Sequence, residues 1–233
     1  MTTWDPRSVL SASQQTTLEA YNALLLEANT RLNLIARTSD PAEVPVRHLA
    51  HSLTLARRGF PEGCTVVDFG TGGGLPGIPL AIAFPNVQFV LLDSTHKKVK
   101  AVETMASTLG LTNVTTQWGR AEAWDGHAHY AVSRATAPLC DLWRWFVRTR
   151  TPISVGPDDW QPGLLALKGG DLSAEIRALK GRPAPRVERN HQLRVAVSLA
   201  PQPRAALRQV TLGEFREQLP VAHGNKPDAL RIF

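Results

Sequence analysis

A glycine-rich segment directly after an apolar run is the part of this chain best suited to chemistry. It reads Val66-Val67-Asp68-Phe69-Gly70-Thr71-Gly72-Gly73-Gly74-Leu75-Pro76-Gly77. Glycines permit a tight turn and let the backbone lie against a ligand, and proline suits the first turn of a following helix. A second apolar run ends at Asp93, at roughly the ~20-residue spacing of an acid that binds a ribose. The pattern predicts a site for a nucleoside-containing cofactor.

Two cofactors fit this segment. Read as Gly72-x-Gly74-x-x-Gly77, it fits the dinucleotide fingerprint. Read as Asp68-x-Gly70-x-Gly72-x-Gly74, it fits the loop of methyltransferases that bind S-adenosylmethionine. The acid favours the second reading, because a carboxylate repels a pyrophosphate and attracts the ammonium group of a methionine moiety. We expect S-adenosylmethionine as the cofactor and S-adenosylhomocysteine as the product, although Asp68 could instead only cap the following helix.

Other function classes stay open at this point. A nucleotide-binding regulator without catalysis and an NAD-dependent reductase are the alternatives from a different class. Many reductases place a lysine four residues after a tyrosine, and neither Tyr21 nor Tyr130 has one there. This absence weighs against a reductase of that type.

Length and composition indicate a cytoplasmic enzyme. The 233 residues, 43% of them hydrophobic, are enough to bury a sizeable core. No apolar run approaches the ~20 residues of a membrane span, and the first residues lack the order of a signal peptide. Cys64 and Cys140 are the two cysteines, so we expect neither a disulfide scaffold nor a metal site. A monomer is expected.

The positive charge is concentrated in the last quarter of the chain. From Arg177 onward there are eleven Lys/Arg against four Asp/Glu, whereas residues 1–176 carry fifteen against sixteen, within a formal net charge of +6. A basic segment attracts phosphate-rich partners. Together with a methyl-donor loop it favours a nucleic-acid substrate, and a solvated face without a ligand is the alternative.

Strand and helix patterns alternate from Cys64 onward. We predict strands over 65–69, 87–92, 114–118, 130–133 and 164–167, with 194–199 and 207–212 completing the sheet. Helices are expected after Ser11 and over 43–58, 76–84, 96–109, 139–147 and 172–179. This order predicts an α/β fold with a doubly wound, mostly parallel sheet over 64–233, preceded by a helical subdomain over 1–63. Ligands of such sheets bind at the carboxyl ends of the strands, where Asp68, Gly70, Asp93, 119–122 and 133–134 fall.

Several further motifs occur in a characteristic order. They are Asn33-Leu34-Ile35, Arg47-His48-x-x-x-Ser52-Leu53, Leu92-Asp93-Ser94-x-x-Lys97-Lys98, Ser133-Arg134-Ala135 and Leu167-Lys168-Gly169. With the glycine-rich segment they make residues 18–180 resemble the glucose-inhibited division protein B family. The chain departs from the family at His51, where an acid is usual, and matches it poorly beyond Arg182.

The resemblance implies a Rossmann-like class I methyltransferase that uses S-adenosylmethionine to modify N7 of one guanine, guanine-527, in 16S ribosomal RNA. The small ribosomal subunit or its assembly intermediate would be the partner. A methyltransferase acting on another RNA, a protein or a small molecule is the alternative. The implied cofactor-binding residues are Asp68, Gly70, Gly72, Gly74, Leu75, Asp93, Ala121, Glu122 and Arg134.

Methylation of guanine N7 requires little chemical assistance from the protein. Its lone pair lies free in the plane of the base, so no general base is required and the enzyme can act by positioning. Asn33, Arg47, His48 and Lys168 are the expected contacts to the guanine or to phosphates.

Overall fold

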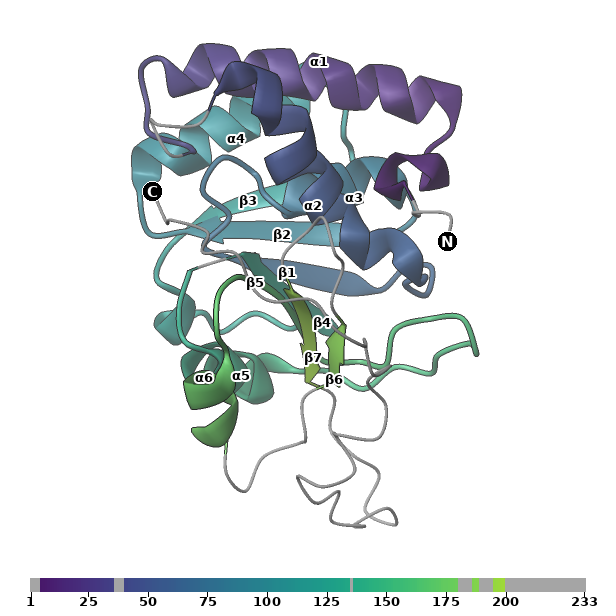
Figure 1. Ribbon diagram of the computed structural model, residues 1–233, viewed down its shortest axis with the longest axis vertical. Coiled ribbons are helices and arrows are strands. Elements are labelled where there is room, and N and C mark those ends of the chain that lie inside the picture. The colour runs from purple at the N-terminus through teal and green to yellow at the C-terminus, as the bar shows by residue number, and fades with distance from the viewer. Residues whose placement is uncertain (1–4, 36–39, 135, 180–185, 189–194, 200–233) are drawn as a thin grey trace, which may run out of the picture. The chain divides into compact units, whose positions relative to one another are not determined.

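The computed structural model describes residues 5–35, 40–134, 136–179, 186–188 and 195–199. These residues form a seven-stranded sheet with the strand order β3-β2-β1-β4-β5-β7-β6 (Figure 1). Neighbouring strands from β3 to β5 are parallel, whereas β7 is antiparallel to β5 and to β6. The predicted doubly wound, mostly parallel sheet is confirmed. The strands are β1 (Thr65–Phe69), β2 (Gln88–Asp93), β3 (Val114–Trp118), β4 (Tyr130–Arg134), β5 (Leu164–Lys168), β6 (Arg186–Glu188) and β7 (Val195–Leu199).

Six predicted strands match observed ones to within about one residue at each end. Strands β1, β4 and β5 are buried almost throughout, as expected for parallel strands that are covered on both faces. The short strand β6 was not predicted, because three residues are too few to show an alternating pattern. The strand predicted over 207–212 and most of the basic segment after Arg177 lie outside the described residues.

Five helices that the sequence predicted accompany the sheet. Helix α1 begins after Ser11, whose hydroxyl accepts a hydrogen bond from the Gln14 N–H while the Gln14 side chain accepts one from the Ser11 N–H, which is the predicted capping box. None of the helices in the described ranges is long and apolar enough to cross a membrane. The helices are α1 (Ala12–Asn29), α3 (Gly77–Ala83), α4 (His96–Thr108), α5 (Leu139–Thr149) and α6 (Ser173–Arg177).

The prediction of one regular helix over 43–58 is wrong. The segment is a 3-10 turn (Pro41–Glu43), a π-helical stretch (Pro45–Ala50), the short helix α2 (His51–Leu53) and a second 3-10 turn (Thr54–Arg57). The hydroxyl of Thr54 donates to the His51 carbonyl, and that of Ser52 donates to the His48 carbonyl. Such side-chain bonds compete with regular helical hydrogen bonding and interrupt it.

The sheet separates two apolar layers. Val66 faces a core shared with α1, α3 and α4, whereas Val67 faces a second core shared with α5 and α6. The alternation follows directly from the two-residue period of a strand. Figure 1 shows α1, α3 and α4 on one side of the sheet and α5 and α6 on the other.

The N-terminal elements pack into the first of these cores. Leu18, Tyr21 and Leu25 of α1 belong to the same buried cluster as Val66. The Gln14 amide also donates to the Ile82 carbonyl at 2.7 Å, near the end of α3. The division predicted at residue 63 stays a prediction.

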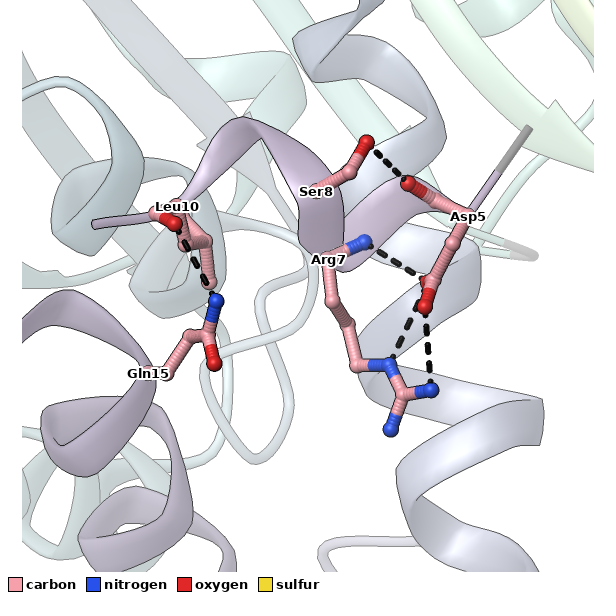
Figure 2. A network of polar contacts seen from close by, with 5 residues as sticks. All are labelled: Asp5, Arg7, Ser8, Leu10 and Gln15. Carbon is pink, nitrogen blue, oxygen red and sulfur yellow. Dashed lines mark hydrogen bonds and ion pairs between the residues drawn. The ribbon is translucent and has the colours of Figure 1, made fainter. Parts of the chain in front are cut away.

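A small polar network shapes the chain before α1 (Figure 2). The Asp5 carboxylate accepts a hydrogen bond from the Arg7 N–H at 3.0 Å and forms an ion pair with its guanidinium at 3.1 Å. The Ser8 hydroxyl donates to the Asp5 carbonyl at 2.7 Å, and the Gln15 amide donates to the Leu10 carbonyl at 3.2 Å. These bonds cap the 3-10 turn Pro6–Val9 and fix how the chain enters α1.

Candidate cofactor and substrate site

The glycine-rich loop turns sharply between β1 and α3. Gly70, Gly72 and Gly74 all have positive φ angles, of 72°, 58° and 96°. At Gly70 a Cβ would lie 2.3 Å from the Thr136 methyl carbon, so a larger residue would be both strained and obstructed. The structure therefore requires glycine at this position, and the contact of this backbone with a ligand stays a prediction.

Asp68 lies beneath this loop and is fully buried. Its Oδ2 accepts hydrogen bonds from the Thr71 hydroxyl at 2.8 Å and from the Gly77 N–H at 2.9 Å, so it ties the loop to the start of α3. Burial raises the pKa of this carboxyl group to about 7, although both hydrogen bonds favour the ionised form and oppose the shift. Asp68 thus caps α3, and its contact with a cofactor ammonium group stays a prediction.

Asp93, the last residue of β2, joins the loop to the next helix. Its Oδ2 accepts a hydrogen bond from the Gly72 N–H at 2.9 Å, and its Oδ1 accepts one from the Thr95 N–H at 2.8 Å. Only 8% of the residue is exposed. Each carboxylate oxygen has a second lone pair, so Asp93 can hold the loop and still accept a hydrogen bond from a ligand hydroxyl group.

A cavity of about 410 Å³ lies at the carboxyl ends of the strands. It is where a doubly wound sheet binds its ligands. Of the nine predicted cofactor-binding residues, Asp68, Gly74 and Leu75 do not line it; Leu75 is buried. The six that line it are Gly70, Gly72, Asp93, Ala121, Glu122 and Arg134.

Ala121 and Glu122 lie in a 3-10 turn that follows β3. The Glu122 carboxylate is half exposed and lies 3.7 Å from the Arg120 guanidinium, too far for a strong ion pair. Its backbone carbonyl accepts a hydrogen bond from the Arg148 side chain of α5. The turn is thus anchored through the backbone of Glu122, and Glu122 also lines the cavity.

Among the cavity-lining residues that sequence reasoning missed are Thr136 and Trp145. Trp145 lies on α5, and its Nε1 is buried without a hydrogen-bond partner among the described residues. A buried indole N–H normally has an acceptor, and this nitrogen has no exposed surface through which a ligand in the cavity could reach it. No motif marks either residue, because their place depends on how α5 packs against β1 and β4.

Arg134, at the end of β4, meets a residue from the N-terminal part of the chain. Its Nη1 lies 2.5 Å from the His48 Nδ1. A guanidinium group can only donate, so Nδ1 accepts and the proton of the neutral ring resides on Nε2. The contact brings the π-helical stretch Pro45–Ala50 to the edge of the cavity, so a predicted substrate contact and a predicted cofactor contact meet there.

Asn33 and Arg47 are both exposed. Arg47 forms an ion pair with Glu43 at 2.8 Å on the protein surface. Asn33 precedes Leu34, whose side chain packs against the glycine-rich loop so closely that a Cβ on Gly73 would lie 3.1 Å from it. Asn33 is therefore the neighbour in sequence of a residue that contacts the loop.

Lys168 is placed differently from the other predicted substrate contacts. Only 8% of it is exposed, and its Nζ donates to the Ala137 carbonyl at 2.5 Å and pairs with the Glu175 carboxylate at 3.0 Å. Glu175 also accepts a hydrogen bond from the Leu139 N–H at 2.9 Å. Lys168 thus anchors the loop after Arg134 to α6, and its contact with a substrate stays a prediction.

The fold and the site define the class of protein first. The strand order and the glycine-rich loop after β1 are those of the class I methyltransferase fold. The structure is similar to that of a methyltransferase from Geobacter sulfurreducens, with a TM-score of 0.51 and 14% identity over 80% of this chain and 89% of that one. It is also similar to a precorrin-6y C5,15-methyltransferase from Geobacter metallireducens, with a TM-score of 0.51 and 11% identity over 75% of this chain and 96% of that one.

The family follows from the sequence comparisons. The model of the GidB family, rRNA small subunit methyltransferase G, matches residues 14–200. Ribosomal RNA small subunit methyltransferase G of Salinibacter ruber is 52% identical over 193 residues, which cover 80% of this chain and 87% of that protein. Its counterpart in Chlorobium luteolum is 46% identical over 170 residues, or 72% of this chain and 67% of that protein. The chain belongs to this family of enzymes, as its motifs predicted.

Proposed function

We propose that this enzyme transfers the methyl group of S-adenosylmethionine to N7 of one guanine, guanine-527, of 16S ribosomal RNA. One observation carries the proposal. The Asp93 carboxylate, held by the Gly72 and Thr95 N–H groups, lines the same cavity as Arg134, to which the His48 ring is joined. A predicted substrate contact, His48, therefore lies next to the cavity that the predicted cofactor-binding residues line.

The residues of the cavity fit the cofactor. Asp93 would accept hydrogen bonds from the ribose hydroxyl groups, and Glu122 one from the adenine amino group. Gly70 and Gly72 line the cavity, so their backbone would contact the bound ligand. When bound, S-adenosylmethionine supplies a methyl group on a positively charged sulfur. Asp68, Gly74 and Leu75, which do not line the cavity, would support the loop.

The substrate side of the site consists of positioning groups. Guanine N7 has a free lone pair, so a bond from N7 to the methyl carbon can form as the carbon–sulfur bond breaks, and no proton has to leave. His48, held by Arg134, together with Asn33 and Arg47, would orient the base and its phosphates. Placing N7 in line with the methyl group is an effect of proximity and orientation, which can account for a large part of a rate enhancement.

The test uses small ribosomal subunits that lack this methyl group and radiolabelled S-adenosylmethionine. Nuclease digestion and mass spectrometry then locate the label. We expect 7-methylguanosine at one position, no label on subunits that already carry the mark, and little transfer by an Asp93→Ala variant. Label on another nucleotide or on a ribosomal protein would refute the proposal. Free 16S rRNA, assayed in parallel, distinguishes the RNA from the assembled particle as the substrate.

The cytoplasm as the location and a monomer as the active form stay predictions from the sequence. Sedimentation of the purified enzyme at several concentrations measures its mass. A mass that rises with concentration would contradict the monomer.

A further inference from the structure

Trp118, the last residue of β3, is an aromatic side chain held in place and yet open to solvent. It is 63% exposed, and it is the one aromatic among the exposed large apolar residues of the described ranges. Its indole N–H donates to the Ser94 carbonyl at 3.0 Å, and the His96 ring lies edge-on to it, with centroids 5.1 Å apart and an interplanar angle of 73°. An exposed tryptophan with a fixed ring is suited to contact another flat group.

The position of Trp118 places it beside the cofactor cavity but not within it. In the register of the parallel strands Trp118 pairs with Asp93. Ser94 and Gly119 line the cavity, whereas Trp118 does not. The strand is at the edge of the sheet among the described residues. A ligand on Trp118 would therefore be a neighbour of the cofactor and of the reacting base.

The surroundings of Trp118 are positively charged. Lys97 and Lys98 lie in the first turn of α4, and no acidic residue lies in that turn, whereas Lys100 is paired with Glu103 at 2.7 Å. Cations at the N-terminal end of a helix are unfavourable because they face the positive end of its dipole. Lys98 also lines the cavity, together with Arg120, two residues after Trp118. These charges favour an anionic partner over an apolar protein surface.

We propose that Trp118 is a stacking platform for an unpaired base of the RNA, on a nucleotide other than the methylated one. Lys97, Lys98 and Arg120 would contact the phosphates on either side. An aromatic face combined with cationic side chains is how proteins bind single-stranded nucleic acid, since every base offers a flat face. The inference rests on the proposed function and names the part of the surface that the RNA would occupy next to the reacting guanine.

The test compares Trp118→Ala with Trp118→Phe, which keeps an aromatic ring, and with Val9→Ala. Val9 is 38% exposed in the first 3-10 turn, so its variant controls for the loss of exposed apolar surface elsewhere. Four properties are measured on each protein, the last of them the midpoint of thermal unfolding. Fluorescence anisotropy follows the binding of a labelled 12-nucleotide single-stranded RNA, and methyl transfer to unmethylated small subunits gives KM and kcat. Calorimetry measures the affinity for S-adenosylmethionine.

We expect Trp118→Ala to weaken RNA binding, and to raise KM for the subunit, by roughly 5- to 150-fold, the range that the loss of one stacked base produces. The kcat, the cofactor affinity and the thermal midpoint should stay unchanged. Trp118→Phe should retain most of the affinity, and Val9→Ala should behave like the wild type.

Three results would overturn the inference. They are unchanged RNA binding and KM in Trp118→Ala, equal losses in the Ala and Phe variants, and a loss confined to cofactor affinity, which would assign the ring to the cofactor. The oligonucleotide measurement does not depend on catalysis. If the wild type binds RNA through Trp118 but does not label a guanine, only the proposed reaction fails.

Discussion

The replacement of Asp68 by asparagine should change how the stability of the enzyme depends on pH. Burial raises the pKa of this carboxyl group to about 7 from an ordinary value of 3.8. Between these two pH values the folded protein holds a proton that the unfolded chain has released. The free energy of unfolding therefore falls as the pH rises through this window, and it becomes constant with respect to this group above pH 7.

The size of the effect follows from the shift in pKa. One pKa unit corresponds to about 1.4 kcal/mol, so the group changes the free energy of unfolding by about 4 kcal/mol over the whole window. Between pH 5 and pH 7 the change amounts to about 2 kcal/mol. The side-chain amide of the Asp68→Asn variant does not titrate in this range, so the variant should lack this part of the pH dependence.

Urea unfolding at pH 5, 6, 7 and 8 measures the difference in free energy between the wild type and Asp68→Asn. Other titrating groups contribute equally to both proteins and cancel. The advantage of the wild type should shrink by about 2 kcal/mol from pH 5 to pH 7. Asp141→Asn, an exchange at the surface of α5, checks that the substitution introduces no pH dependence by itself. A difference that stays constant over this range would show that Asp68 is already ionised at pH 5 and would refute the argument from burial.

Three further substitutions test the site. The two carboxylate oxygens of Asp93 each accept a hydrogen bond from a backbone N–H group, and Asp93→Asn removes one of these acceptors. The variant should lose about 2 kcal/mol of stability and bind the cofactor at least ~10-fold more weakly. Unchanged cofactor affinity by calorimetry would contradict the role of Asp93. Gly70→Ala should abolish cofactor binding, whereas Gly110→Ala, with a similar φ of 68° but no atom within 4 Å of the new Cβ, should cost only about 1 kcal/mol. Equal effects of the two substitutions would rule out the close approach of neighbouring atoms as the reason that Gly70 must be glycine. Lys168→Met leaves the carboxylate of Glu175 without its ion-pair partner and should cost about 2 kcal/mol in urea unfolding. If it lowered methyl transfer at unchanged stability, Lys168 would be a substrate contact instead.

The sequence by itself determined six strands of the sheet and the place of the cavity at their carboxyl ends. A strand is recognisable from its own apolar run, and the positive φ angles of the loop require glycines wherever the loop occurs. The acid at the end of β2 could be found for the same reason, since its partners, the N–H groups of Gly72 and Thr95, belong to the backbone of the neighbouring turns. These features depend on local geometry, which a single stretch of sequence contains.

The tertiary structure alone decided which side chains from distant elements meet. His48 and Arg134 are 86 residues apart and form a contact at the cavity, while Lys168 turns away to Glu175 and the Ala137 carbonyl. The irregular helix around His48 and the exposed face of Trp118 were likewise not readable from residue patterns. Packing of whole elements against one another sets such pairs and exposures, because it depends on the volumes and hydrogen bonds of many residues at once, and no local motif encodes it.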